Sequence, residues 1–367
     1  MLNKISINKL FLRKILKFIF LVRYLLLIFL ISIFTFLIIP KFMDFKKDFN
    51  TINNYLKMSY NLDVKSYDKI NYKIFPRPKL VISNSKIHIG SSRVAELVKG
   101  NLDLKIRVAD IYQIKNLNIR KVYLYNYDIN LQLDDIKKLL RSISSIKNKI
   151  NIFHSTLKLK DKDKIILVLK NVNASNVNLK NLKFSAKLLE KKILVNFIKQ
   201  KNNNKLNLTI KKLGIETEAI FLKESNLDNL IGEAKVQILN NKFRFNFNFK
   251  DVLKITKSNF RNKNLVTSFN GVVEINPFLN FDIIFNIKKI NKNMGEININ
   301  RFLNKEYLKK INGKFLVLYE NNSQLNSGLI KKSQINLSIK NGNFFVDESK
   351  ILFSGGLLNF YGDTFNF

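Results

Sequence analysis

Alternation of apolar and polar residues with a period of two runs through most of the chain beyond about residue 150, and it restricts the possible folds more than any other feature. The clearest case is KFRFNFNFK, residues 242–250, in which every second residue is phenylalanine. Period two places alternate side chains on one face of a β-strand. No long helical pattern interrupts residues 150–367, so the crossover helices of a parallel sheet are not expected. The pattern predicts a mostly antiparallel sheet joined by short connections.

Further segments repeat this alternation, and turn residues separate them. Asn341-Gly342 predicts a hairpin turn, and Asp161-Lys162-Asp163 predicts another tight loop. We expect a strand with one apolar face at each of these sets: Tyr123, Tyr125, Tyr127, Ile129, Leu131 and Leu133; Leu206, Leu208 and Ile210; Phe281, Ile283, Phe285 and Ile287; and Ile335, Leu337 and Ile339.

A few short segments predict helices instead. Residues 91–99 are expected to form a short helix closed by Gly100, and Asp134 is a suitable N-cap for another. Two helices would each bury one apolar stripe, formed by Phe45, Phe49, Ile52 and Leu56 in the first and by Ile136, Leu139, Leu140 and Ile143 in the second.

Residues 18–39, FIFLVRYLLLIFLISIFTFLII, are strongly apolar. As a helix rising about 1.5 Å per residue, they would span about 33 Å, which matches the hydrocarbon core of a bilayer. The one charge, Arg23, lies near the end, where its side chain can reach the interface. We predict an uncleaved membrane anchor. A cleaved signal peptide is the alternative, but no small-x-small cleavage site follows the run.

The charges around this run predict its orientation. The residues that precede or open it are basic without any acidic residue, whereas those just after it are nearly balanced. This asymmetry keeps the N-terminus in the cytoplasm and translocates everything beyond Pro40. The basic residues are Lys4, Lys9, Arg13, Lys14, Lys17 and Arg23.

The chain has 64 Lys and Arg against 27 Asp and Glu, which gives a formal net charge of +37. The basic residues are spread along the chain, and Lys, Asn, Ile and Phe are abundant together, as a low-GC coding bias would produce. No nucleic-acid partner is expected on this basis. The alternative to compositional drift is a preference for anionic partners, with lipid head groups first.

Composition also excludes several kinds of active site. Without Cys the chain has no disulfide framework, thiolate nucleophile or Cys-ligated metal, and its two histidines, His88 and His154, are too few for a histidine-rich site. No nucleophile elbow, P-loop or dinucleotide fingerprint is present. We therefore expect no enzyme, no metal and no cofactor.

A sheet with one apolar face needs something to cover that face. A second sheet would do so in a β-sandwich or barrel. The long meander, poor in Gly and Pro, equally fits one curved sheet that folds into an open apolar trough. Such a trough is unstable in water unless an apolar ligand occupies it, and acyl chains are the natural occupant. The residue pattern alone leaves both alternatives open.

Residues 18–133 carry a more specific order of features. The anchor is followed by a strand that runs into the turn Phe75-Pro76-Arg77-Pro78, then by the strand LVISNSKIHIG and by a strand pair within IKNLNIRKVYLYNYDINLQL. This order resembles the N-terminal region of the AsmA family of bacterial envelope proteins. The rest of the chain is similar to that family only in its alternating strands.

The resemblance implies a chorein-like, taco-shaped β-groove rooted in the inner membrane, with a periplasmic body that helps to move phospholipids toward the outer membrane. The chain is short for that family. About 320 residues at roughly 14 per strand and turn would give on the order of 23 strands, or a trough of roughly 110 Å. A distal partner among the envelope proteins, an oligomer or a longer chain is therefore expected.

Together these features predict a mainly β protein with an N-terminal transmembrane helix, a long curved antiparallel sheet and a few short helices. We divide it into a cytoplasmic basic tail (1–17), the anchor (18–39), an AsmA-like β region (40–149) and an extended β-groove (150–367). Its predicted function is binding or conducting phospholipid; a non-conducting scaffold for outer-membrane proteins is the alternative. The turn residues Phe75, Pro76 and Pro78 have a structural role, and the candidate lining residues are Phe243, Phe245, Phe247, Phe249, Phe281, Phe285, Leu206 and Leu208.

Overall fold

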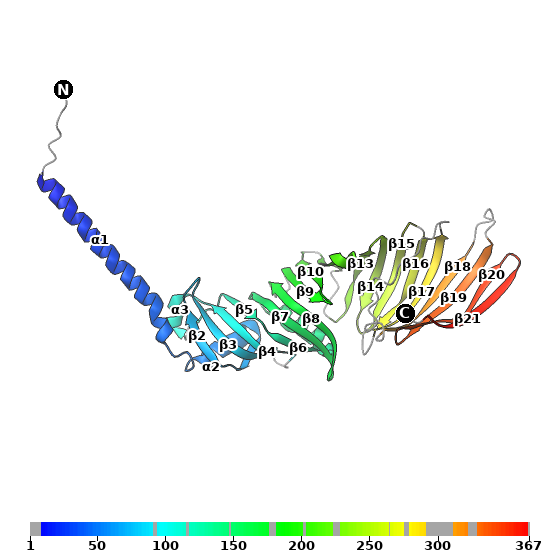
Figure 1. Cartoon of the computed structure of the whole chain (residues 1–367), viewed down its shortest axis with the longest axis horizontal. Coiled ribbons are helices and arrows are strands. Elements are labelled where there is room, and N and C mark those ends of the chain that lie inside the picture. Colours follow the sequence, from blue (N-terminus) through cyan, green and yellow to red (C-terminus); the bar gives the residue numbers. More distant parts are fainter. Residues whose placement is uncertain are drawn as a thin grey trace, which may run out of the picture.

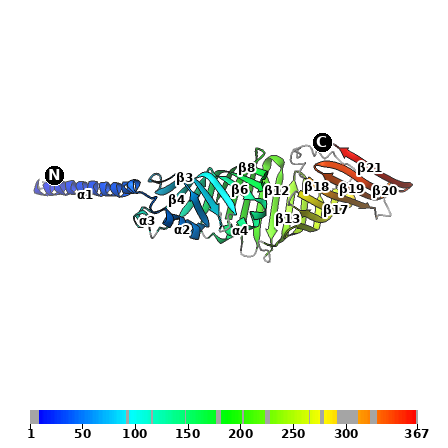
Figure 2. The ribbon, with the colours of Figure 1, turned by 90° about the horizontal axis from the view of Figure 1, so that it is seen from below.

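The chain forms one elongated body, with a single helix projecting from one end (Figures 1 and 2). The strands lie across the long axis of this body and follow one another along it. The computed structural model describes residues 9–90, 94–114, 117–146, 148–175, 181–200, 203–222, 228–263, 265–274, 279–290, 311–321 and 329–365.

The projecting helix is α1 (Lys9–Ile38), and the short 3-10 helix η1 (Ile39–Phe42) follows it. The stretch Lys17–Phe42 is long and apolar enough to cross a membrane, and its most apolar window is entirely unburied. The predicted apolar helix is therefore present. Near the C-terminal end of α1, the Phe36 ring stacks on the Tyr112 ring of the body, with centroids 4.9 Å apart.

The body is built on one sheet of 21 strands in the described part of the chain. Its helices are α2 (Phe49–Tyr60), α3 (Val108–Tyr112) and α4 (Ile136–Ser145), with 3-10 turns η3 (Leu133–Asp135) and η4 (Lys211–Leu213). The strands are β1 (Leu62–Ser66), β2 (Lys69–Lys73), β3 (Lys79–Ile89), β4 (Ala95–Lys105), β5 (Lys121–Tyr125), β6 (Asp128–Gln132), β7 (Ile150–Asp161), β8 (Lys164–Ser175), β9 (Asn181–Leu188), β10 (Lys191–Lys199), β11 (Asn204–Ile210), β12 (Ile215–Phe221), β13 (Leu230–Ile238), β14 (Asn241–Phe249), β15 (Leu253–Arg261), β16 (Leu265–Glu274), β17 (Leu279–Ile290), β18 (Ile311–Glu320), β19 (Ile330–Lys340), β20 (Asn343–Phe353) and β21 (Gly356–Phe365).

Neighbouring strands pair antiparallel from β7 to β17 and from β18 to β21, as the alternation predicts. Three pairs are parallel: β5 and β6 each pair with β7, and β17 pairs with β18. Both predicted tight turns are confirmed. Lys340 pairs with Asn343 across Asn341-Gly342, whose φ angles are 52° and 83°. Asp161 pairs with Lys164 across a two-residue turn in which Lys162 has a φ of 54°.

The prediction of one continuous strand face from Tyr123 to Leu133 is wrong. Asn126 takes a left-handed conformation with a φ of 59°, and this residue divides the segment into β5 and β6. The division shifts the alternation by one residue, because Val122 and Leu124 are buried in β5. Tyr123 and Tyr125 consequently lie on the opposite face from Tyr127, Ile129 and Leu131, which are buried.

The predicted helix over residues 91–99 is also wrong. Residues 95–105 form β4, residue 94 is described without regular structure, and residues 91–93 lie outside the described part. Gly100 is buried within β4, and a Cβ atom there would lie 2.3 Å from Cγ of Tyr127. The glycine therefore makes room for the ring of Tyr127, which lies just before the neighbouring strand β6, and does not end a helix.

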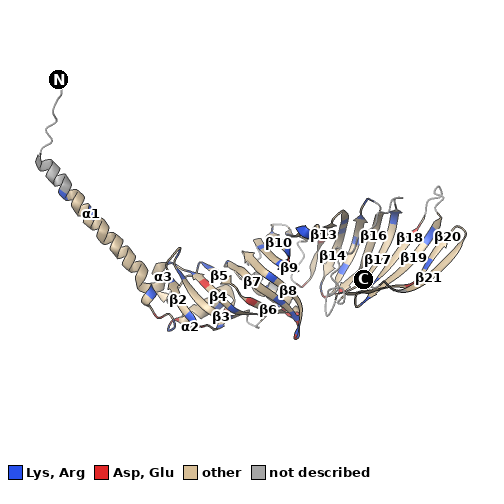
Figure 3. Cartoon of the chain, in the orientation of Figure 1, with Lys and Arg blue, Asp and Glu red and all other residues tan. Residues whose placement is uncertain are grey.

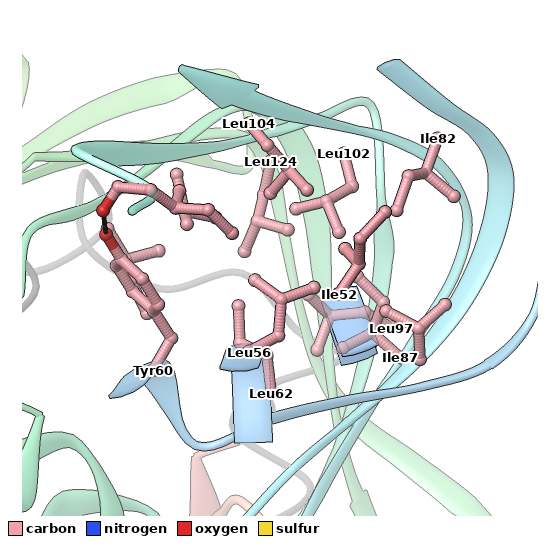
Figure 4. Packing of buried hydrophobic residues seen from close by; sticks show 14 of the residues in the cluster. Ile52, Leu56, Tyr60, Leu62, Ile82, Ile87, Leu97, Leu102, Leu104 and Leu124 are labelled. Atoms are coloured by element: carbon pink, nitrogen blue, oxygen red, sulfur yellow. Dashed lines mark hydrogen bonds between the residues drawn. The ribbon is translucent and has the colours of Figure 1, made fainter. Parts of the chain in front are cut away.

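The densest apolar core lies beneath α2. Ile52, Leu56 and Tyr60 of this helix are completely buried against the sheet, where they meet residues such as Leu102 and Leu104 of β4 (Figure 4). The Tyr60 hydroxyl donates a hydrogen bond of 2.6 Å to the Ile119 carbonyl oxygen. The predicted first stripe is confirmed, although its first member, Phe45, is buried just before the helix begins.

The second predicted helix is present as α4, but Asp134 does not begin it. This residue lies in the 3-10 turn η3, and α4 starts at Ile136. Ile136 and Leu139 pack against the core, whereas the side chains of Leu140 and Ile143 lie outside the described residues.

We predict that Leu56→Ala loosens α2 without unfolding the distal sheet. Removing a fully buried leucine side chain costs about 2–5 kcal/mol, so hydrogen exchange of α2 amides should accelerate about 30-fold or more. Hydrogen exchange with mass spectrometry measures this. Met58→Ala is the matched control, because Met58 lies on the same helix and is 89% exposed. Equal exchange rates in the two variants would contradict the packing described above.

Candidate functional site

Cross-strand pairing brings the predicted apolar residues onto one face of the sheet. Residues directly opposite each other on neighbouring strands point to the same side. Leu206 of β11 lies opposite Ala219, Ala219 lies opposite Ala234, and Phe245 of β14 continues this row. A parallel row passes through Leu208, Thr217, Val236, Phe243 and Phe260.

Two further rows on the same side cross the distal strands. Ile255 of β15 lies opposite Phe247, and Leu253 lies opposite Phe249. From there one row runs through Gly271, Ile283, Phe315 and Leu337 to Val346, and another runs through Val273, Phe281, Gly313 and Ile339 to Phe344. We call this surface the apolar face; all eight predicted lining residues lie on it, namely Leu206, Leu208, Phe243, Phe245, Phe247, Phe249, Phe281 and Phe285.

Phenylalanine rings join the predicted residues into a continuous series. The Phe269 ring centroid lies 5.9 Å from that of Phe245 and 5.8 Å from that of Phe285. The Phe315 ring lies 5.8 Å from Phe285 and 4.4 Å from Phe281. Aromatic contacts therefore connect β14 with β18.

Phe269 and Phe315 were not predicted as lining residues. In β16, Thr267 and Gly271 take positions on the same face and dilute the alternation around Phe269. In β18, the continuous run FLVLY hides the period around Phe315. The available signal was the even spacing of apolar residues, Leu265, Phe269 and Val273 in one strand and Phe315, Val317 and Tyr319 in the other.

The apolar face is incompletely buried, unlike the core beneath α2. Phe247 is 8% exposed, and the other seven predicted lining residues are half-buried. Among the described residues beyond 148, the single helical element is the 3-10 turn η4, and every strand belongs to the same sheet. No second layer therefore covers most of this face in the described part of the chain.

Helix α4 lies at one border of the apolar face. Lys137 of α4 donates a 3.0 Å hydrogen bond to Asp251 in the β14–β15 turn, and its Nζ lies 5.8 Å from the centre of the Phe249 ring. Arg141 of α4 also pairs with Asp228, just before β13. On a flat sheet the seven strand spacings from β7 to β14 would cover about 34 Å. The contacts of this ten-residue helix therefore indicate that the sheet bends.

The opposite side of the sheet, which we call the polar face, carries charged pairs. Lys205 lies 2.6 Å from Glu218, and Arg244 lies 2.6 Å from Glu233. The hydrogen bond from Lys205 holds the pKa of Glu218 below its ordinary value. A concavity of about 850 Å³ opens over β10–β15 on this side, lined mainly by polar-face residues that include Glu216, Glu218, Lys235, Lys242, Arg244 and Arg261. Leu208, Val236 and Phe243 also contribute to its lining.

Two glycines allow aromatic rings to lie flat on the apolar face. A Cβ atom at Gly313 would lie 2.4 Å from the Phe281 ring, and one at Gly232 would lie 2.8 Å from the Phe247 ring. Both rings belong to the predicted lining residues. Glycine opposite an aromatic residue is a known way to pack a sheet surface.

Phe75, Pro76 and Pro78 lie apart from these residues, in the loop between β2 and β3. The Phe75–Pro76 peptide bond is cis, and the Phe75 side chain is 86% exposed. Residues 75–77 form a bend in this loop, and the Phe75 ring is exposed to the surroundings.

The two histidines have polar partners. His88 Nε2 lies 3.4 Å from Glu96 Oε1, and His154 Nδ1 lies 3.2 Å from Asn171 Oδ1. In the described ranges, no three His, Cys, Asp or Glu side chains come together as metal ligands.

Comparison of the sequence with known protein families finds no matching family, and comparison with curated proteins finds no matching relative. The assignment of a function consequently depends on the geometry of the apolar face and on the membrane-length helix.

We predict that Gly313→Ala destabilises the distal sheet, because the new methyl group would overlap the Phe281 ring. Overpacking of this kind costs about 1–3 kcal/mol, so the melting temperature of the sheet should fall by a few degrees. Gly355→Ala is the control, since nothing lies within 4 Å of a Cβ atom there. Thermal unfolding followed by circular dichroism measures both variants. An unchanged melting temperature for Gly313→Ala would mean that the Phe281 ring does not lie against Gly313.

Proposed function

We propose that the chain is a membrane-anchored protein that binds phospholipid acyl chains on its apolar face and supports phospholipid transport toward the outer membrane and envelope integrity. One observation carries the proposal: rows of apolar side chains run from β11 to β20, and most of this surface has no second layer over it among the described residues. Soluble proteins rarely leave so large an apolar surface in water.

The gain from an acyl chain is large enough to occupy such a surface. Burial contributes about 0.8 kcal/mol per methylene group, so a chain of about 16 carbons could gain on the order of 10 kcal/mol. Phe245, Phe285 and Phe315 offer flat rings at spacings of about 6 Å or less from the next ring. Similar sites repeated along the face favour sliding over tight binding at one position.

The mechanism is passive in this proposal. Acyl chains would move along the apolar face while head groups stay in water, and the direction would come from outside the chain. The core beneath α2 fills the end of the sheet next to α1. Lipid would therefore reach the apolar face from the side that no second layer covers. The taco-like groove predicted from the AsmA resemblance fits the bend that the α4 contacts require.

The membrane-length helix gives this proposal a location. With the basic residues that precede or open the apolar run, the anchor would sit in a bacterial inner membrane with its N-terminus in the cytoplasm and the sheet in the periplasm. The resemblance of residues 18–133 to the AsmA family supports the same placement. No enzymatic activity or cofactor is part of this proposal.

Site-specific photo-crosslinking in growing cells tests the proposal. We expect probes at Phe245 and Phe285 to capture phospholipid, because both side chains lie half-buried on the apolar face. Probes at Asn246 and Asn248 are matched controls, since these exposed residues alternate with the phenylalanines on β14. Lipid adducts confined to the phenylalanine positions are the predicted result.

Two other results would contradict lipid binding. If the probes at Phe245 and Phe285 crosslink only within the chain, the apolar face is ordinary core. If they capture another protein instead, the alternative function, a scaffold for outer-membrane proteins, would replace lipid transport.

A further inference from the structure

A row of lysines crosses four neighbouring strands at one end of the sheet. Lys73 at the end of β2 lies opposite Lys79 at the start of β3. Lys79 in turn lies opposite Lys105 of β4, and Lys105 lies opposite Lys121 of β5. Because paired residues point to the same side, all four side chains leave the sheet on one face.

Such a row needs a compensating negative charge. Like charges directly opposite each other on adjacent strands destabilise a sheet. Lys79 lies 2.5 Å from Asp103, and Lys105 donates a 2.9 Å hydrogen bond to the Tyr123 hydroxyl. In the part of the chain that the structure describes, no carboxylate lies within ion-pair distance of Lys73, Lys105 or Lys121. Within the described residues, the row therefore has one ion pair, between Lys79 and Asp103.

The lysine row lies beside the base of α1. Strand β2 contacts η1, which directly follows α1. Strand β4 leads from Lys105 into α3, where the Tyr112 hydroxyl donates a 2.7 Å hydrogen bond to the Phe36 carbonyl oxygen of α1. The Tyr112 and Phe36 rings also stack, with centroids 4.9 Å apart. Figure 1 shows β2 and α3 at this junction, and Figure 3 marks the Lys and Arg positions in blue.

Exposed aromatic and basic side chains extend this surface. Phe75 is 86% exposed and Phe42, in η1, is 81% exposed. Arg77 is exposed in the same loop as Phe75, between Lys73 and Lys79. Apolar rings among basic residues are typical of protein surfaces that lie in the head-group region of a bilayer.

We propose that this basic platform, formed by Lys73, Lys79, Lys105, Lys121, Phe75 and Arg77, binds anionic phospholipid head groups of the bilayer that α1 enters. The Phe75 ring inserts between the head groups, and the lysines face their phosphates. The proposal depends on α1 being a membrane anchor, but it does not depend on lipid occupying the apolar face. It gives the loop around Pro76 a role beyond shaping a turn.

The chain contains no tryptophan, so Phe75→Trp introduces a single fluorophore. We would reconstitute the full chain in phosphatidylcholine vesicles with and without about one-third phosphatidylglycerol, and measure quenching by brominated lipids. Quenching of Phe75→Trp in anionic vesicles is expected. Tyr361→Trp, in the distal strand β21 and 87% exposed, should stay unquenched. Phe29→Trp, within α1, reports whether the helix inserts.

The lysines are tested in the Phe75→Trp background. Each lysine near an anionic surface strengthens association about fivefold. The double variant that combines Lys73→Gln and Lys121→Gln should therefore lower the ratio of quenched to unquenched fluorophore about 25-fold. Lys331→Gln with Lys332→Gln, exposed on β19, is the control and should leave the ratio unchanged.

The controls separate failure of this inference from failure of the anchor. Quenching of Phe29→Trp without quenching of Phe75→Trp overturns the platform while the anchor stands. If Phe29→Trp is not quenched, the anchor and the platform that depends on it both fail. Equal quenching in neutral and anionic vesicles overturns the assignment to anionic head groups, as does an emission shift of Phe75→Trp produced by inorganic phosphate alone.

Discussion

A sheet with one apolar face must be covered, and this constraint governs the whole molecule. Beneath α2 the constraint is met inside the chain, because Ile52, Leu56 and Tyr60 are fully buried against the sheet. Farther along, the same kind of face continues as rows of Phe, Leu and Ile, and the described residues supply no equivalent helix. The fold therefore raises the question of what covers this second part, and our proposal is that acyl chains do.

The polar features fit the same division. On the polar face, pairs such as Lys205 with Glu218 keep charged side chains in water. The lysine row at the base of α1 differs from these pairs, because Asp103 is the one carboxylate that meets it within the described residues. Charged pairs recur along the polar face, whereas the lysine row beside the membrane-length helix holds a single such pair in the described part of the chain.

Sequence reasoning succeeded where local pattern decides structure. Period two identified the strands that contain Phe245 and Phe285, and Asn341-Gly342 identified a hairpin, since these signals depend on neighbouring residues alone. It failed where a contact between residues distant in the sequence determines the local structure. In the sequence, Gly100 looks like the end of a helix, but in the structure it makes room for the Tyr127 ring. The left-handed Asn126 likewise shifts the alternation, so that different side chains of β5 are buried than the sequence pattern predicts. The rows themselves, the parallel pairing of β17 with β18 and the bend at α4 depend on register between strands, which a single sequence does not encode locally.

The central claim, that lipid occupies the apolar face, is tested most directly by spin-label accessibility. Because the chain has no native cysteine, Leu206→Cys, Phe245→Cys and Phe285→Cys can each carry one label in the membrane-embedded protein. Lipid around the label gives high collision rates with oxygen and low rates with a polar nickel complex. That pattern at all three positions is the predicted result. Low rates with both reagents would mean a dry protein core, and high rates with the nickel complex would mean water; either would contradict the claim.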